Sequence, residues 1–151
     1  MLDLKIPPPI VAILCGLGIV YLPDLFGLEA FEIPLQGWVA GVVIVFGLSF
    51  DLMGLLEFRK HATTISPLSP NKSVLVVSSG IYRVTRNPMY LGMAIVLVGV
   101  TIAFGSAIGL LMVLVFVLYI TRFQIKPEER ILEAKFGEAF VDYKAKVKRW
   151  I

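Results

Sequence analysis

The chain has 151 residues, enough for one domain, and 58% of them are hydrophobic while only 17% are charged. That balance lies outside the usual range of soluble proteins. Together with a mean hydropathy of +0.86, it indicates that lipid rather than water is the main solvent. The net charge is +3, and we expect a membrane partner and no nucleic-acid partner. The single cysteine, Cys15, cannot close an internal disulfide, and we expect it to be a small core residue.

Four apolar segments are candidates for membrane spans. The hydrocarbon core is about 30 Å thick, and an isolated helix needs roughly 20 apolar residues to cross it. The candidates occupy residues 10–28, 37–58, 88–104 and 106–123. We expect Pro23 to end the regular part of the first segment early. No convincing small-residue cleavage site accompanies that segment, so we expect a retained anchor rather than a cleaved signal.

The last two candidates lie in one long apolar stretch. From Tyr90 to Thr121 there is no charged residue, and this length is too great for one crossing of ordinary thickness. Gly105 and Ser106 near the middle supply a turn, which predicts a hairpin. Each half has about 15 residues, short for a span unless the flanking residues also lie near the interfaces. The alternative, one long tilted helix, is disfavoured because the bilayer must absorb the mismatch.

The basic residues predict the orientation, because short cytoplasmic loops carry an excess of Lys and Arg. With four spans and a cytoplasmic N-terminus, all 14 basic residues fall on the inner side. The outer side receives Asp24, Glu29 and Glu32 and the uncharged turn. This agreement supports the hairpin and predicts that both termini are cytoplasmic. The compact single-module form indicates a prokaryotic inner membrane.

Most of the remaining polar residues gather in a loop at residues 59–89 and a tail at residues 124–151, on the same predicted side. The loop contains a polar stretch at 61–64 and a β-prone run at 74–77, which Ser78-Ser79-Gly80 breaks. Pro88 suits the first turn of the third span, where its missing N–H costs nothing. Asn87 before it is then a natural N-cap.

The tail predicts two short helices. The first begins at Pro127, carries Glu128 and Glu129 in its first turn, where negative charge suits the helix dipole, and stops at Gly137. The second covers residues 138–147 and has an apolar stripe at helical spacing, which we expect to pack against the bundle. The stripe consists of Phe140, Tyr143 and Val147.

Several separated motifs in these two segments point to a known family. They are Gly80-Ile81-Tyr82-Arg83, Arg86-Asn87-Pro88-Met89-Tyr90-Leu91-Gly92, Pro127-Glu128-Glu129, and Phe136-Gly137 followed by Tyr143 and Val147-Lys148-Arg149, with Thr63-Thr64 and Pro67 upstream. In this order the chain resembles the isoprenylcysteine carboxyl methyltransferase family and its phospholipid methyltransferase relatives. The resemblance covers the part from the second loop onward, while the first two spans are generic.

The resemblance implies a membrane enzyme that binds S-adenosylmethionine in a cytoplasmic pocket and takes a lipophilic acceptor, an isoprenylcysteine carboxylate or another lipid, from the bilayer. We therefore expect an all-α membrane protein, a single domain over residues 1–151, with four transmembrane helices and short cytoplasmic C-terminal helices that close a cofactor pocket. We expect no metal. The residues implied to bind the cofactor are Gly80, Tyr82, Arg86, Asn87, Pro88, Tyr90, Leu91, Glu128 and Glu129.

Methyl transfer from a sulfonium needs positioning more than covalent help, and we expect Arg86 and Glu129 to be the catalytic pair. Arg86 can bind a carboxylate by a two-pronged contact, or it only marks the inner interface. The carboxylates of Glu128 and Glu129 can accept hydrogen bonds from the ribose or amino group, or they only complement the dipole. Tyr82 and Tyr90 can stack on adenine or face the sulfonium, or they anchor at the interface.

Three points stay open in the sequence. In the eukaryotic prenylcysteine enzymes the Asn87 position is histidine, so the acceptor can differ here. His61, the only histidine, is a weak candidate for a general base. Asp51 inside a span is a functional hypothesis by default, although snorkelling or pairing with a cytoplasmic cation explains it about equally well. The rival functions are a membrane reductase with a nicotinamide cofactor and a non-enzymatic four-helix transporter or scaffold.

Overall fold

The structure is a computed structural model and describes residues 3–60 and 76–151. Within these ranges every regular element is helical, which confirms the predicted all-α class there. The elements are α1 (Pro8–Leu25), α2 (Gln36–Lys60), the 3₁₀ turn η2 (Gly80–Arg83), α3 (Pro88–Ala103), α4 (Gly109–Ile120), the π-helical turn η3 (Thr121–Ile125), α5 (Lys126–Phe136) and α6 (Glu138–Lys146). Val76 and Val77 of the β-prone run have irregular backbone. Outside the described residues lie Val74, Leu75, His61, Thr63, Thr64 and Pro67.

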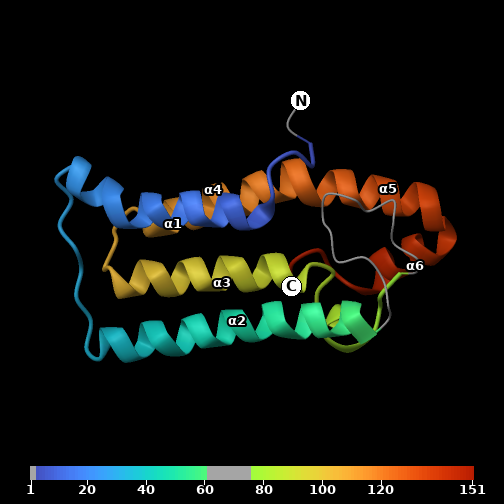
Figure 1. Cartoon of the computed structure of the whole chain (residues 1–151), viewed down its shortest axis with the longest axis horizontal. Helices are drawn as coiled ribbons and strands as arrows, with labels where there is room; N and C mark the ends of the chain where they lie inside the picture. The colour runs from blue at the N-terminus through green and yellow to red at the C-terminus, as the bar shows by residue number, and fades with distance from the viewer. Residues whose placement is uncertain (1–2, 61–75) are drawn as a thin grey trace.

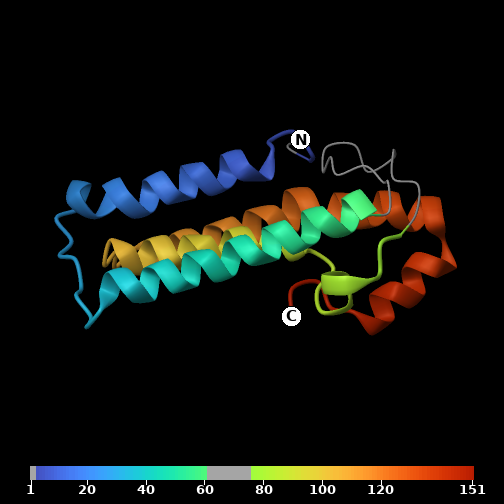
Figure 2. The same ribbon diagram turned by 60° about the horizontal axis from the view of Figure 1, so that its bottom comes forward.

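Helices α1 to α4 run alongside one another as an elongated bundle (Figures 1 and 2). Helix α3 is central because it packs against α1, α2 and α4. Its residues Tyr90, Ala94 and Leu97 join the core between α1 and α4, where Ile19 and Phe116 are fully buried. Many large apolar side chains of α1, α2 and α4 instead point outward and are exposed, as expected of helices whose outer surface meets lipid.

Helices α2 and α3 approach closely because small residues line their contact. Ala40, Gly47 and Gly54 recur every seven residues on α2, which places them on one face, and all three are buried. A Cβ at Gly47 would lie 2.8 Å from the carbonyl oxygen of Gly92 and 2.9 Å from the backbone nitrogen of Val96. The two backbones therefore pack directly against each other.

The predicted hairpin is confirmed. Helix α3 ends at Ala103 and α4 begins at Gly109, and Gly105 turns the chain with a φ of +58° that favours glycine. The α1–α2 connection meets this turn at the same end of the bundle. The Phe31 N–H donates to the Gly105 carbonyl over 2.9 Å, and Gln36 Nε2 donates to the Ile102 carbonyl over 2.8 Å.

Three helical stretches are long and apolar enough to cross a membrane, namely Pro8–Leu25, Gln36–Lys60 and Gly109–Phe136. Helix α3 is equally apolar but has 16 residues, about 24 Å at the usual rise per residue. The third stretch, with 28 residues, exceeds the thickness of the hydrocarbon core, about 30 Å. Its charged end, α5, therefore lies beyond the span. These helices fit an integral membrane protein.

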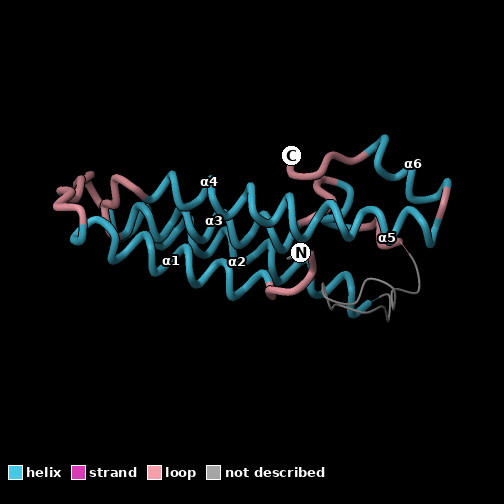
Figure 3. The backbone as a smooth tube through the Cα atoms, turned by 90° about the horizontal axis from the view of Figure 1, so that it is seen from above, coloured by secondary structure: helices cyan, strands magenta, loops and turns pink. Residues whose placement is uncertain are grey.

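Two helix ends differ from the sequence prediction. Helix α1 continues through Pro23 and ends at Leu25, because Pro23 lies in the last turn and interrupts few hydrogen bonds. The tail helix does not start anew at Pro127. Helix α4 passes through η3 into α5 without a break, and the wider π turn lies directly before the proline. Gly137, with a φ of +54°, ends α5 as predicted, and α6 then folds back (Figure 3).

Candidate functional site

The segment before α3 and the tail after α4 meet at one end of the bundle. The Tyr143 hydroxyl donates to the Tyr82 carbonyl over 2.8 Å. The backbone N–H of Arg86 donates to the Lys148 carbonyl over 3.0 Å, and Asn87 Nδ2 donates to the Arg149 carbonyl over 2.9 Å. The sequence-based enzyme hypothesis required these two segments to fold toward each other and enclose a cofactor pocket. The structure brings the segments together, and the pocket stays a prediction.

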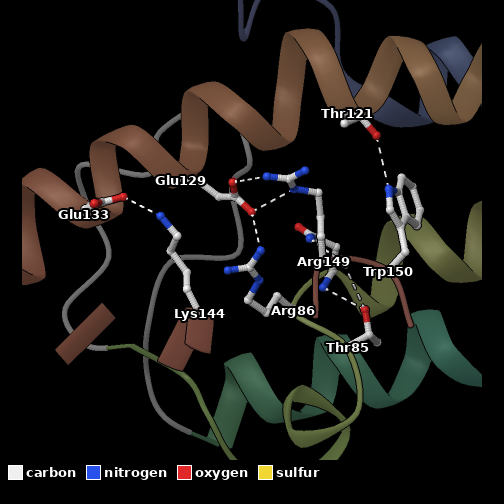
Figure 4. Close-up of polar contacts among 9 residues, drawn as sticks. Thr85, Arg86, Thr121, Glu129, Glu133, Lys144, Arg149 and Trp150 are labelled. Carbon is white, nitrogen blue, oxygen red and sulfur yellow. Dashed lines mark hydrogen bonds and ion pairs between the residues drawn. The ribbon is translucent and has the colours of Figure 1, made fainter. Parts of the chain in front are cut away.

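Glu129 lies between two arginines at this junction (Figure 4). Arg86 Nη2 donates to Glu129 Oε1 over 2.8 Å, while Arg149 donates from Nε to Oε1 over 3.0 Å and from Nη2 to Oε2 over 2.7 Å. The side chains of Arg86 and Glu129 are 10% and 12% exposed, and that of Arg149 is 33% exposed. The hydrogen bond to Glu129 raises the pKa of Arg149 above its usual value. Two guanidinium groups on one carboxylate leave one positive charge in excess.

Arg86 has donors to spare. Its Nε and Nη1 atoms are buried and have no hydrogen-bond partner among the residues that the structure describes. A buried donor without a partner is costly, and more so when it is charged. These donors lie in a cluster with excess positive charge. A carboxylate ligand would supply an acceptor for a buried donor and would also neutralise the excess charge.

Glu128 is held by a second group of residues on the bundle side of the junction. Tyr90 Oη donates to its Oε1 over 2.7 Å, and Gln124 Nε2 donates to the same oxygen over 3.0 Å. Burial raises the pKa of the Glu128 carboxyl to about 7, although these two hydrogen bonds oppose the shift. Glu128 is therefore a carboxyl group that can change its charge near neutral pH.

Tyr82 is buried in a satellite core between η2 and α6. It shares this core with the predicted stripe, Phe140, Tyr143 and Val147. The stripe therefore has a packing role, but it packs around η2 and Phe58 and not in the core of the bundle. The Tyr82 ring meets the Phe58 ring edge to face, with centroids 5.3 Å apart. Burial raises the pKa of the Tyr82 hydroxyl far above its usual value. Gly80, with a φ of +55°, lets the chain turn tightly against Glu57.

Asn87 stands at the N-cap position of α3, but its side chain makes no capping hydrogen bond. The predicted cap is therefore wrong in its contact, because the amide is engaged by the Arg149 carbonyl instead. Pro88 occupies the first turn as predicted, and both Pro88 and Leu91 are buried.

Some sequence-predicted features lie apart from this junction. Asp51 Oδ1 is buried against Gly92 and has no hydrogen-bond partner in the described part of the chain, so no pairing with a cation is seen there.

An open cavity of about 400 Å³ lies between Ser78 and Arg83 on one side and helix α6 on the other. None of the predicted cofactor residues lines it; its lining is Ser78, Arg83, Ala139, Asp142, Tyr143, Lys146 and Val147.

Sequence reasoning missed two residues of the junction, Gln124 and Arg149, as site candidates. Arg149 was recognised only as part of a terminal motif, and nothing in its spacing predicts that it reaches Glu129. Gln124 had a weak signal: it is a polar residue four positions before Glu128, which places both on one face of a helix.

The fold and the junction define a helical membrane protein with a polar site at one end. The family profile described as phospholipid methyltransferase matches residues 35–139, more than two thirds of the chain, and the chain belongs to this family. This membership implies a membrane methyltransferase. The matched range includes Arg86, Glu128 and Glu129 but ends before Arg149.

A curated relative adds a partial match. An uncharacterized protein of Haemophilus influenzae (strain ATCC 51907 / DSM 11121 / KW20 / Rd) is 43% identical over 63 residues, which cover 42% of this chain and 100% of that protein. No solved structure matches the chain. The comparisons give no support to a reductase, a transporter or a scaffold.

Proposed function

We propose that this protein transfers the methyl group of S-adenosylmethionine to a lipophilic acceptor taken from the bilayer, at the junction of the pre-α3 segment with the tail. The observation that carries the proposal is the pair of unpartnered, buried donors on Arg86, next to the carboxylates of Glu128 and Glu129. The methionine part of the cofactor carries one carboxylate and one ammonium group, and its ribose carries two hydroxyls. Donors and acceptors of the matching kinds are present in the cluster.

The protein's own residues then have separate tasks. Arg86 offers Nε or Nη1, which lie on different edges of the guanidinium, to the ligand carboxylate while Nη2 stays on Glu129. Glu128 accepts a hydrogen bond from the ribose or the amino group, and the nearby aromatic rings of Tyr82 and Tyr90 exclude water. The bound cofactor would supply a sulfonium-activated methyl group: the sulfur–carbon bond breaks, the acceptor–carbon bond forms, and the electron pair stays on sulfur. Rate then depends on how well the residues hold donor and acceptor in line.

The acceptor class follows from the surroundings and the family. The exposed surface of the bundle is apolar, and the family profile carries the description phospholipid methyltransferase, so we propose a lipid acceptor. A phospholipid amine needs to lose a proton before attack, whereas an isoprenylcysteine carboxylate does not. We further propose four membrane crossings with both termini cytoplasmic in a prokaryotic inner membrane, since the basic residues collect at the end of the bundle that holds the junction.

The direct test is incubation of membranes containing the protein with methyl-labelled S-adenosylmethionine, followed by mass analysis of the lipids that gain label. Labelled lipid above the level of membranes without the protein is expected. Retention of all label on the cofactor would count against the proposal. Competition of labelled cofactor by a nicotinamide dinucleotide would favour the reductase instead.

The residue-level test uses Arg86→Ala and Glu129→Gln in the purified protein. Each is expected to weaken cofactor binding at least tenfold, because a charge-assisted contact is worth more than about 1.4 kcal/mol. Glu133→Gln is the matched control: it is the same change on the same helix, at a carboxylate that is 45% exposed and paired with Lys144. Helical content by circular dichroism shows that each variant is folded. Wild-type affinity in both site variants would remove the assignment.

A further inference from the structure

Gln124 has no task in the proposed function, yet its surroundings are unusual. It lies in the π-helical turn η3 and is 2% exposed. π turns are rare and interrupt the normal hydrogen-bond ladder. Burying a side-chain amide is unfavourable unless its polar atoms are bonded, so an apolar residue would be the simpler choice at this position. The Nε2 atom of Gln124 donates to Glu128 over 3.0 Å, which gives the amide a reason to be there.

The geometry around Glu128 is specific. Gln124 approaches Oε1 from η3, and Tyr90 approaches the same Oε1 from α3. Two donors from different elements hold this oxygen from two directions and restrict the orientation of the carboxylate more than one donor would. Both bonds also favour the charged form and oppose the effect of burial.

We propose that Gln124 is a positioning residue, which together with Tyr90 holds Glu128 in one orientation and keeps it ionised for contact with the cofactor. This inference rests on the proposed function. Other groups also act on Glu128: the neighbouring Glu129 and the hydroxyls of Tyr82 and Tyr90. The charge of Glu129 is offset by Arg86 and Arg149, and Gln124 also acts on the Tyr90 hydroxyl, so Gln124 and Tyr90 act on Glu128 together.

The test is Gln124→Met, which keeps the length of the side chain and removes the donor. Loss of one hydrogen bond to a charged group is expected to raise the pKa of Glu128 by about one unit. Cofactor affinity, measured between about pH 6 and pH 9.5, is then expected to fall about tenfold more at the acid end than at the alkaline end, where only the loss of orientation remains. Glu128 is ionised at the alkaline end in both proteins. A merely structural role would lower affinity equally at every pH, and that result overturns the proposal.

A second readout needs no cofactor. Infrared difference spectra between each protein and its Glu128→Gln variant give the protonation of Glu128 directly, and Gln124→Met is expected to shift this titration upward. An unchanged titration overturns the proposal. If wild type binds no S-adenosylmethionine while the titration still moves, the proposed function fails and the coupling of Gln124 to Glu128 stands.

The matched control is Gln36→Met. Gln36 also donates from Nε2, but to the Ile102 carbonyl at the opposite end of the bundle. In this variant neither the titration of Glu128 nor the pH profile of cofactor affinity should change. Tyr90→Phe removes the other donor to Glu128 and is expected to shift the titration in the same direction. This variant keeps the proposal testable if Gln124→Met does not fold.

Discussion

At the scale of single residues, the site is organised around contacts with the last residues of the described chain. Arg149 contributes its guanidinium to Glu129 and its carbonyl to Asn87 and Thr85, while Trp150 donates to the Thr121 hydroxyl over 3.1 Å. The C-terminal segment thereby ties the segment before α3 to the helix after it. Movement of this segment would change both sides of the cluster at once.

Asn87→Ala tests this tie. The substitution removes the hydrogen bond from Nδ2 to the Arg149 carbonyl, a loss of about 1 kcal/mol. We expect a lower thermal midpoint in detergent and faster trimming of the C-terminus by carboxypeptidase. Ser49→Ala is the control, because the Ser49 hydroxyl donates to the nearby Phe46 carbonyl in an exposed place on α2, away from the junction. Equal trimming of the two variants would show that Asn87 does not hold the segment.

The sequence predicted that Arg86, Asn87, Glu128 and Glu129 belong to one site, but it missed Gln124 and Arg149 and several contacts. Capping rules place Asn87 correctly at the start of α3, because those preferences are local, whereas Glu128 and Glu129 lie in a helix that continues from η3. The predicted Asn87 contact was wrong because Nδ2 donates to a carbonyl 62 residues away in sequence, and this long-range bond orients the amide. Cofactor binding stays a prediction for the rest of the predicted set, which includes Gly80, Tyr82 and Leu91.

At the scale of elements, the close packing of α2 against α3 depends on glycines at their contact, which carry no side chain to hold the backbones apart. A Cβ at Gly47 meets backbone atoms of α3, at 2.8 Å and 2.9 Å, which cannot move aside as a flexible side chain can. Gly47→Ala is expected to cost about 1–3 kcal/mol through overpacking. Thermal unfolding in detergent measures this cost.

Gly41→Ala is the matched control on the same helix, because nothing lies within 4 Å of a Cβ at that position. It should be neutral or stabilising by up to about 1 kcal/mol, since alanine is the better helix former. If both variants lose the same stability, the loss at Gly47 does not come from contact with α3, and the close approach of α2 and α3 is not needed for stability.

Elements with strong periodic or compositional signals were predicted well, and their junctions less well. The apolar runs, the turn at Gly105 and the stop at Gly137 follow from local chemistry, so the hairpin and the end of α5 are confirmed. The continuous helix through η3 was not predicted, because proline and charge at Lys126-Pro127 usually mark a helix start. A π turn before the proline accommodates both, and no pattern in the sequence indicates it.

At the scale of the whole molecule, the charge distribution follows the long axis of the bundle. The α1–α2 connection, which carries Glu29 and Glu32, meets the uncharged Gly105 turn at one end. The opposite end holds Arg86, Arg149 and the charged helices α5 and α6 (Figure 1). An excess of basic residues on the cytoplasmic side is the general rule for membrane proteins. This rule therefore predicts that the bundle crosses with the proposed site on the cytoplasmic side.

Single cysteines in a Cys15→Ser background test this arrangement in intact cells with a membrane-impermeant maleimide. Glu32→Cys and Phe104→Cys lie at the acidic end, and both side chains are exposed; we expect both to be labelled from outside. Lys146→Cys in α6 is exposed at the other end, and labelling is expected only after the cells are opened. Labelling of Glu32→Cys but not Phe104→Cys from outside would mean that the 16-residue α3 does not complete a crossing. The reverse pattern at all three positions would place the methyl-transfer site outside the cell, away from the cytoplasmic cofactor it is proposed to use.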